Sequence, residues 1–261
     1  MFQFTKQQIQ KSKLKTDPFP YIFIKNFNPN SFNKKLNKIL PNFKELSNSE
    51  VMFQSKSQTK KTLLPSSNLY KKIKNEKNIN DLNNLFKKLK PVIIKKFKKE
   101  INKYVVEKFQ KTKLNYHSSY SVMKKGYLKS AHLDRRDHLI HMIYYSSSES
   151  NKGGEICIQK LKTNEKKFDV FPEKKSISTF KKYKIFPNSC IIILNVPWAY
   201  HSVNKYVGKK DRKYFYMVYD FPIKKKGSKV ENRKKGFNGN VFWKQKVKIK
   251  SRKRKNVFLT E

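Results

Sequence analysis

The stretch Tyr127-Leu128-Lys129-Ser130-Ala131-His132-Leu133-Asp134 ends in a His-x-Asp pair. Residues two apart on a β-strand point to the same face, so one strand can present His132 and Asp134 to a single metal ion. A third candidate ligand, His201, follows much later in Trp198-Ala199-Tyr200-His201-Ser202-Val203, just past the apolar run Cys190–Leu194. That separation predicts a ligand delivered across a barrel from a strand that is distant in sequence.

Two imidazoles and one carboxylate are a ligand set that holds Fe(II) on one face and leaves adjacent coordination positions open. Two of those positions can take a chelating 2-oxo acid, and another can take O₂. A His-x-Asp tripeptide is weak evidence by itself, because it is common by chance. The later His201 and the arginine that follows it make the pattern much more specific.

Arg212 opens an aromatic segment after His201, and its guanidinium offers a rigid fork that matches a carboxylate. Lys213 is its neighbour, and strand alternation allows only one of the two cations to face inward. The bidentate geometry of arginine favours Arg212 for that position.

The stretch resembles the 2-oxoglutarate- and Fe(II)-dependent oxygenases, in particular the prolyl-4-hydroxylase-like branch. The resemblance covers about residues 17–222, with the motifs in the expected order. One departure is Ala131, where many relatives have proline. The matching pieces are Asp17-Pro18-Phe19-Pro20-Tyr21-Ile22-Phe23-Ile24-Lys25-Asn26-Phe27, 127–134, Leu139-Ile140-His141-Met142-Ile143-Tyr144-Tyr145, Gly153-Gly154-Glu155-Ile156, Phe186-Pro187-Asn188, and Tyr200-His201-Ser202-Val203 with Arg212.

The resemblance implies an α+β fold: a double-stranded β-helix (jelly-roll) core with N-terminal helices packed on one sheet. It implies Fe(II) bound by His132, Asp134 and His201, and Arg212 paired with the distal carboxylate of 2-oxoglutarate. The implied reaction is oxidative decarboxylation of 2-oxoglutarate to succinate and CO₂ with hydroxylation of a substrate C–H bond. O₂ is the co-substrate, and ascorbate is a candidate reductant.

Several other residues have two interpretations each. Tyr144 or Tyr120 could donate a hydrogen bond to 2-oxoglutarate, or both could be core aromatics. His138 and His141 are predicted to be hydrogen-bonded strand histidines rather than ligands. Arg135 and Arg136 are expected to be exposed, and positive charge beside the iron would suit an anionic substrate.

The chain divides into three parts by pattern. Residues 1–16 read as a polar lead-in segment and residues 17–222 as the dioxygenase domain, helical to about 115 with the jelly-roll core over 116–222. Residues 223–261 form a basic C-terminal extension.

Helical spacing is expected after Asn28–Ser31 and again from Asn80, where Pro91 predicts a kink or two helices. Residues 45–79 read as loops with a short strand near 51–53, and further strands are expected at Tyr21–Ile24, Ser119–Met123, Leu139–Tyr145, Glu155–Gln159, Cys190–Leu194 and Tyr214–Tyr219.

The net charge of +44 in 261 residues suggests a polyanionic partner such as nucleic acid. The abundance of Lys and Asn also fits the codon bias of an AT-rich genome, although such bias would not suppress Asp and Glu. In the extension, Phe237, Phe242 and Trp243 stand among basic residues, with the densest runs at 224–226 and 252–255. These aromatics could stack on nucleic acid or dock on the parent domain, and docking is the preferred interpretation.

We therefore expect a dioxygenase that hydroxylates a peptidyl prolyl or other side chain, a sugar or a small molecule. The alternatives are an oxygenase acting on nucleic acid and a non-catalytic, basic nucleic-acid-binding protein.

No apolar run is long enough for a membrane span, and the N-terminus lacks the apolar core of a signal peptide. Cys157 and Cys190 lie in apolar strand-like runs and are expected to be buried free thiols, which makes the cytoplasm the expected location. The sequence does not indicate an oligomeric state.

Overall fold

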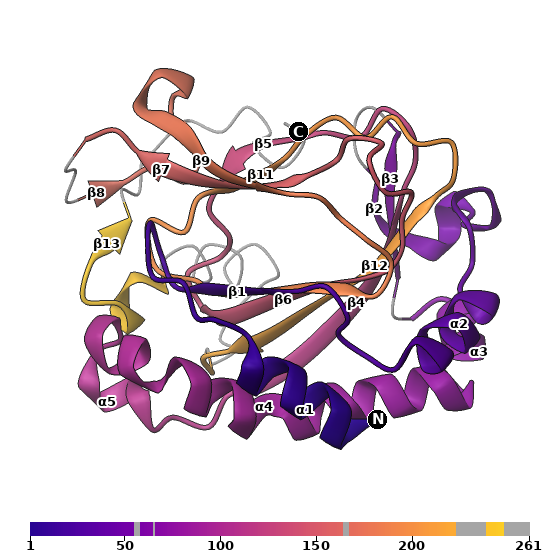
Figure 1. Ribbon diagram of the computed structural model, residues 1–261, viewed down its shortest axis with the longest axis horizontal. Coiled ribbons are helices and arrows are strands. Elements are labelled where there is room, and N and C mark those ends of the chain that lie inside the picture. Colours follow the sequence, from indigo (N-terminus) through magenta and orange to yellow (C-terminus); the bar gives the residue numbers. More distant parts are fainter. Residues whose placement is uncertain (55–57, 65, 164–166, 223–238, 248–261) are drawn as a thin grey trace.

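The computed structural model describes residues 1–54, 58–64, 66–163, 167–222 and 239–247 (Figure 1). These residues form two large β-sheets, a short two-stranded sheet and a layer of helices. None of the helices in the described ranges is both long enough and apolar enough to span a lipid bilayer.

The larger sheet contains seven strands. Every pairing in it is antiparallel. In spatial order its strands are β1 (Tyr21–Ile24), β10 (Ser189–Leu194), β6 (His138–Ser147), β12 (Arg212–Asp220), β4 (Asn115–Met123), β3 (Lys60–Leu63) and β2 (Val51–Gln54). The central strands β10, β6 and β12 are almost entirely buried because both faces of the sheet are covered.

The smaller sheet lies across the inner face of the larger one (Figure 1). Its spatial order is β5 (Lys129–His132), β11 (His201–Val203), β7 (Ile156–Leu161) and β9 (Ile177–Tyr183). A separate parallel pair joins β8 (Lys167–Phe168) to β13 (Lys246–Val247).

Helices cover the outer face of the larger sheet. The longest is α4 (Lys77–Tyr104), whose apolar stripe from Ile79 to Ile101 is buried. The hydroxyl of Tyr219 on β12 donates to the Phe86 carbonyl of α4 at 2.6 Å. The other helices are α1 (Phe2–Lys11), α2 (Asn30–Ile39), α3 (Asn68–Lys74) and the single turn α5 (Glu107–Gln110), with short 3₁₀ turns at Phe43–Glu45, Asn48–Glu50, Lys174–Ser176 and Gly239–Phe242. The predicted packing of N-terminal helices on one sheet is confirmed.

The structure corrects several of the predicted elements. α4 continues through Pro91 as one helix, so of the two predicted alternatives, a kink or two helices, the second is wrong. Residues 45–79 hold β3 and α3 as well as the expected short strand. The edge strand β9 was not predicted, because its middle residues are exposed and lack an apolar alternation. Cys157 and Cys190 are buried free thiols, as expected.

Part of the C-terminal extension packs on the domain. Phe242 and Trp243 are buried, and the Phe242 ring stacks on Phe221 with centroids 4.3 Å apart. The docking interpretation therefore holds for these two aromatics, which are not available to stack on nucleic acid. Phe237 and the basic runs at 224–226 and 252–255 lie outside the described residues.

Candidate metal centre

His132 and His201 lie opposite each other on neighbouring strands. His132 is the last residue of β5 and His201 is the first of β11, and the two residues are partners in the antiparallel register. Their ring centroids are 4.4 Å apart. The smaller sheet thus brings together two histidines that are far apart in the sequence.

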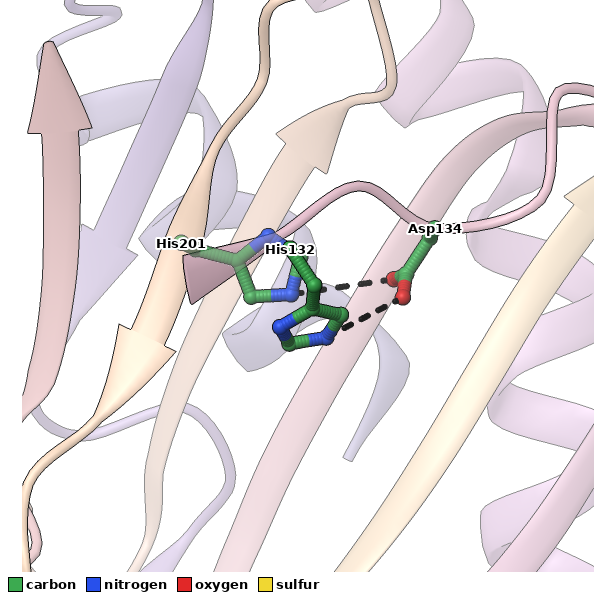
Figure 2. A group of neighbouring side chains, drawn as sticks. All are labelled: His132, Asp134 and His201. Carbon is green, nitrogen blue, oxygen red and sulfur yellow. Dashed lines mark ion pairs between the residues drawn. The ribbon is translucent and has the colours of Figure 1, made fainter. Parts of the chain in front are cut away.

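Asp134 completes the group (Figure 2). Its Oδ1 lies 3.5 Å from Nε2 of His132, and its Oδ2 lies 3.8 Å from Nε2 of His201. One donor atom from each of the three residues falls within 4.8 Å of the other two, which is compatible with a shared metal ion. The structure therefore brings together the three residues that the sequence singled out as ligands.

Asp134 is not on the same strand as His132, and this part of the prediction is wrong. β5 ends at His132, and residues 133–137 form a loop before β6 begins at His138. The chain must cross from the smaller sheet to the larger one within this loop, so the strand cannot continue through Asp134. The carboxylate reaches the histidines from the loop instead.

Both histidines direct Nε2 toward the carboxylate because Nδ1 is already bound. Nδ1 of His132 lies 2.9 Å from the Ser130 carbonyl, and Nδ1 of His201 lies 3.1 Å from the Ala199 carbonyl. A carbonyl accepts a hydrogen bond, so Nδ1 carries the proton and Nε2 presents its lone pair. Bonds of this kind are the usual outer partners of metal-binding histidines.

The protonation states also suit metal binding. Burial alone would raise the pKa of Asp134, but the adjacent His141, His201 and His132 hold it well below its usual value. Burial and the neighbouring His132 lower the pKa of His201 to about 4. At neutral pH the group therefore offers a carboxylate and a neutral imidazole, the forms that bind metals.

Two more residues lie beside Asp134: Tyr216, which the sequence analysis missed, and His141. The Tyr216 hydroxyl donates to Oδ2 of Asp134 at 2.9 Å. His141 is fully buried, with Nδ1 3.2 Å from the same oxygen, yet neither ring nitrogen makes a hydrogen bond within the described residues. The prediction of a hydrogen-bonded histidine holds for His138, which bonds Asp220, and fails for His141. Strand alternation from Arg212 would have identified Tyr216.

The expectation that Arg135 and Arg136 are both exposed holds for Arg135 and is wrong for Arg136. Arg135 is exposed and pairs with Asp137 through two hydrogen bonds, the shorter 2.7 Å. Arg136 is fully buried, and its guanidinium bonds backbone and side-chain oxygens of its own loop and of Asn195. Neither arginine is a free cation beside the histidines, which removes this argument for an anionic substrate.

Arg212 faces the space between the sheets, whereas Lys213 faces the helices. Arg212 Nε donates to Ser148 Oγ at 3.0 Å, and its terminal nitrogens donate to the carbonyls of Gly153 and Gly154. Lys213 Nζ donates to the Leu40 carbonyl on the outer side. The choice of arginine as the inward cation is confirmed.

Gly154 makes room for this arginine. Its φ is +67°, and a Cβ placed there would lie 2.3 Å from NH1 of Arg212. The Gly153-Gly154 pair that the sequence singled out thus forms part of the cradle around the guanidinium.

Tyr144 and Tyr120 lie on the face of the larger sheet that points away from the smaller sheet and its two histidines. The Tyr144 hydroxyl donates to Asn33 of α2 at 2.6 Å, and the Tyr120 hydroxyl donates to the Pro41 carbonyl at 2.7 Å. Both phenols are committed to the helical layer. Tyr145, one residue along β6, faces inward instead, and the Arg212 guanidinium lies 5.8 Å from its ring centroid. Its buried hydroxyl makes no hydrogen bond within the described residues.

No protein-family model and no curated protein matches this chain. Among solved structures it resembles a Pseudomonas putida prolyl-4-hydroxylase, with a TM-score of 0.51 and 9% identity over 85% of this chain and 100% of that one. It also resembles a Trichoplax adhaerens prolyl hydroxylase in complex with a hypoxia inducible factor peptide fragment (TM-score 0.48, 12% identity, 84% and 90% covered). HygX from Streptomyces hygroscopicus, with nickel and 2-oxoglutarate bound, gives a TM-score of 0.45 at 11% identity, with 83% and 87% covered.

At these identities the likeness concerns the fold. The P. putida protein is matched over its whole length. The chain has the fold of the prolyl-4-hydroxylase-like 2-oxoglutarate- and Fe(II)-dependent oxygenases.

Proposed function

We propose that this protein is an Fe(II)- and 2-oxoglutarate-dependent dioxygenase with a double-stranded β-helix core. His132, Asp134 and His201 would hold the metal, and the convergence of their donor atoms within 4.8 Å carries the proposal. When bound, Fe(II) with 2-oxoglutarate and O₂ supplies the chemistry of oxidative decarboxylation and C–H hydroxylation. The donor set fits that ion, because two neutral imidazoles and a carboxylate leave an open face.

Arg212 and Tyr145 would bind the distal carboxylate of 2-oxoglutarate. Each terminal nitrogen of Arg212 donates one hydrogen bond to a glycine carbonyl. Each also carries a second N–H group, which can donate a hydrogen bond to a carboxylate. The Tyr145 hydroxyl is a buried donor with no hydrogen-bond partner in the described ranges, beside that guanidinium. A buried polar group without a partner is costly, and an incoming carboxylate would remove that cost.

The substrate belongs to one of the classes expected from the sequence: a peptidyl prolyl or other side chain, a sugar or a small molecule. Nucleic acid is the alternative, suggested by the charge of +44. It loses one of its supports, because Phe242 and Trp243 are buried in the domain.

Succinate release tests the proposal. The wild-type protein with Fe(II), 2-oxoglutarate and ascorbate is assayed against pools of peptides, sugars, nucleotides and small molecules. We expect succinate that depends on Fe(II), its loss in His132→Ala, and its persistence in the matched control His117→Ala. His117 lies apart from the metal-site group and pairs with Asp220. Equal succinate formation by His132→Ala and wild type would refute the assignment.

A further inference from the structure

Asp134 is the one expected ligand that no strand holds in place. His132 and His201 are each fixed by a β-ladder, whereas Asp134 lies in the loop of residues 133–137. Its position therefore depends on the bonds that hold this loop. Two of the bonds to other segments are backbone bonds, from Leu133 N–H to the Val170 carbonyl and from Phe221 N–H to the Asp137 carbonyl, both 2.9 Å, and the others come from side chains.

Arg136 is the first of these side chains. It is fully buried, and its Nε donates to the backbone carbonyl of Asp134 at 3.0 Å. Its terminal nitrogens reach Asn195, at 3.1 Å for the carbonyl and 3.0 Å for Oδ1. Asn195 Nδ2 in turn donates to the carbonyls of Arg135 at 2.6 Å and His138 at 3.1 Å. These bonds close the loop on itself and on the segment after β10.

Trp243 holds the loop from outside. Its fully buried indole N–H donates to the carbonyl of Arg136 at 2.7 Å. That carbonyl belongs to the residue whose guanidinium binds the Asp134 backbone. Trp243 is thus two hydrogen bonds away from the backbone of Asp134, although it belongs to the C-terminal extension.

The segment that carries Trp243 is attached on both sides. The Val106 N–H donates to the Phe242 carbonyl at 3.0 Å, and the Lys244 N–H donates to the Tyr104 carbonyl at 3.0 Å. β13 follows and pairs with β8, so the segment runs from the end of the helical layer toward the smaller sheet (Figure 1).

We infer that Trp243 is a positioning residue for Asp134 and that the C-terminal segment Gly239–Val247 thereby sets the metal affinity of the site. The inference rests on the proposed function in that it takes His132, Asp134 and His201 as metal ligands. Without the indole N–H, the Arg136 carbonyl is left unpaired and the loop gains alternative conformations. Metal binding then has to order the loop, and this cost lowers the affinity of the site for the metal. Loss of a direct outer partner of a metal ligand typically reduces affinity by about 10–100-fold, and Trp243 acts one bond further out, so the lower end of that range is the expected size.

The test compares Trp243→Phe with Tyr120→Phe in the full chain. Both substitutions keep an aromatic ring and remove one buried donor at 2.7 Å from a backbone carbonyl, but Tyr120 bonds Pro41 beneath the helices. Co²⁺ is the probe, followed by titration calorimetry and by its visible absorption spectrum. Amide hydrogen exchange of residues 133–138 is measured in the metal-free proteins.

We expect Trp243→Phe to weaken Co²⁺ binding by about tenfold, to alter the Co²⁺ spectrum and to speed exchange in the loop. Tyr120→Phe should change none of the three. If both variants bind Co²⁺ as the wild type does, the inference is overturned and the proposed function stands. If the wild type binds no Co²⁺, or if His132→Ala binds Co²⁺ as tightly as the wild type does, the proposed function and this inference both fail.

Discussion

The hydroxyl of Tyr216 and Oδ2 of Asp134 are joined by a hydrogen bond of 2.9 Å. This bond links the central strand β12 of the larger sheet to the loop that carries the expected carboxylate ligand. Because a carboxylate that binds a metal through one oxygen leaves the other free, the phenol determines which oxygen is presented to the metal. Tyr216 is therefore the first residue to test beyond the three expected ligands.

Replacing Tyr216 with Phe should weaken metal binding by about tenfold, because a metal ligand loses its outer partner. A hydrogen bond to a charged group contributes about 1.5–3 kcal/mol, so the metal-free protein should also lose up to that much stability. Calorimetric Mn²⁺ titration and urea unfolding in EDTA measure the two effects. Tyr219→Phe, on the same strand but bonded to Phe86, should lower stability without changing Mn²⁺ affinity. Equal Mn²⁺ affinities for the two variants would contradict this role.

Replacing Arg212 with Met should remove most of the affinity for 2-oxoglutarate. Truncating one partner of a buried charge pair costs about 2–5 kcal/mol, and the lower figure already corresponds to a factor of about 30 in affinity. The matched control is Lys213→Met, because Lys213 bonds Leu40 on the outer face. Titration of 2-oxoglutarate into the Mn²⁺-loaded proteins measures both. If Lys213→Met loses affinity for 2-oxoglutarate and Arg212→Met keeps it, the carboxylate-binding role has been assigned to the wrong cation.

Gly154→Ala should impair 2-oxoglutarate binding although Arg212 and Tyr145, the two expected partners of its distal carboxylate, are unchanged in sequence. The added Cβ would meet NH1 of Arg212 at 2.3 Å, and the backbone has a φ of +67°. The guanidinium has to move or the loop has to rearrange. The same 2-oxoglutarate titration detects the change, and Gly126→Ala is the control. Gly126 also has a positive φ (+98°), but its Cβ would meet only Thr59, at 3.3 Å. Wild-type affinity in Gly154→Ala would show that Arg212 is not held in place by this glycine.

Acid should lower the free energy of unfolding, because it protonates Asp220. Burial alone would raise the pKa of Asp220, but hydrogen bonds from His117 and His138 outweigh it and lower the pKa to about 2. A depressed carboxyl pKa stabilises the fold above the unfolded pKa of about 4, and this stability is lost as the pH falls toward the folded pKa. The difference in unfolding free energy between wild type and Asp220→Asn should be about 2 kcal/mol near neutral pH and should shrink between about pH 4 and pH 2. A difference that does not vary with pH would contradict this assignment.

The sequence singled out the three residues that the structure brings together, because its signals are local or ordered along the chain. The histidines and Asp134 were found from motif order, and the inward arginine from strand alternation. It failed at Asp134, whose loop position depends on where the chain crosses between sheets. It also chose Tyr144 over Tyr145, because the inward face of a strand buried on both sides cannot be identified from an unbroken apolar run. Tyr216 was missed although strand alternation from Arg212 indicates it. Trp243 could not be linked to Arg136, since nothing in the extension indicates where it docks.

An anaerobic titration of the Fe(II)-loaded protein with 2-oxoglutarate tests the central claim most directly. Chelation of Fe(II) by a 2-oxo acid gives a visible charge-transfer absorption. The proposed site predicts this absorption in the wild type at one equivalent of Fe(II), its absence in Asp134→Ala, and a much higher half-saturating 2-oxoglutarate concentration in Arg212→Met. Stoichiometric Fe(II) binding by the wild type with no absorption that depends on 2-oxoglutarate would contradict the claim.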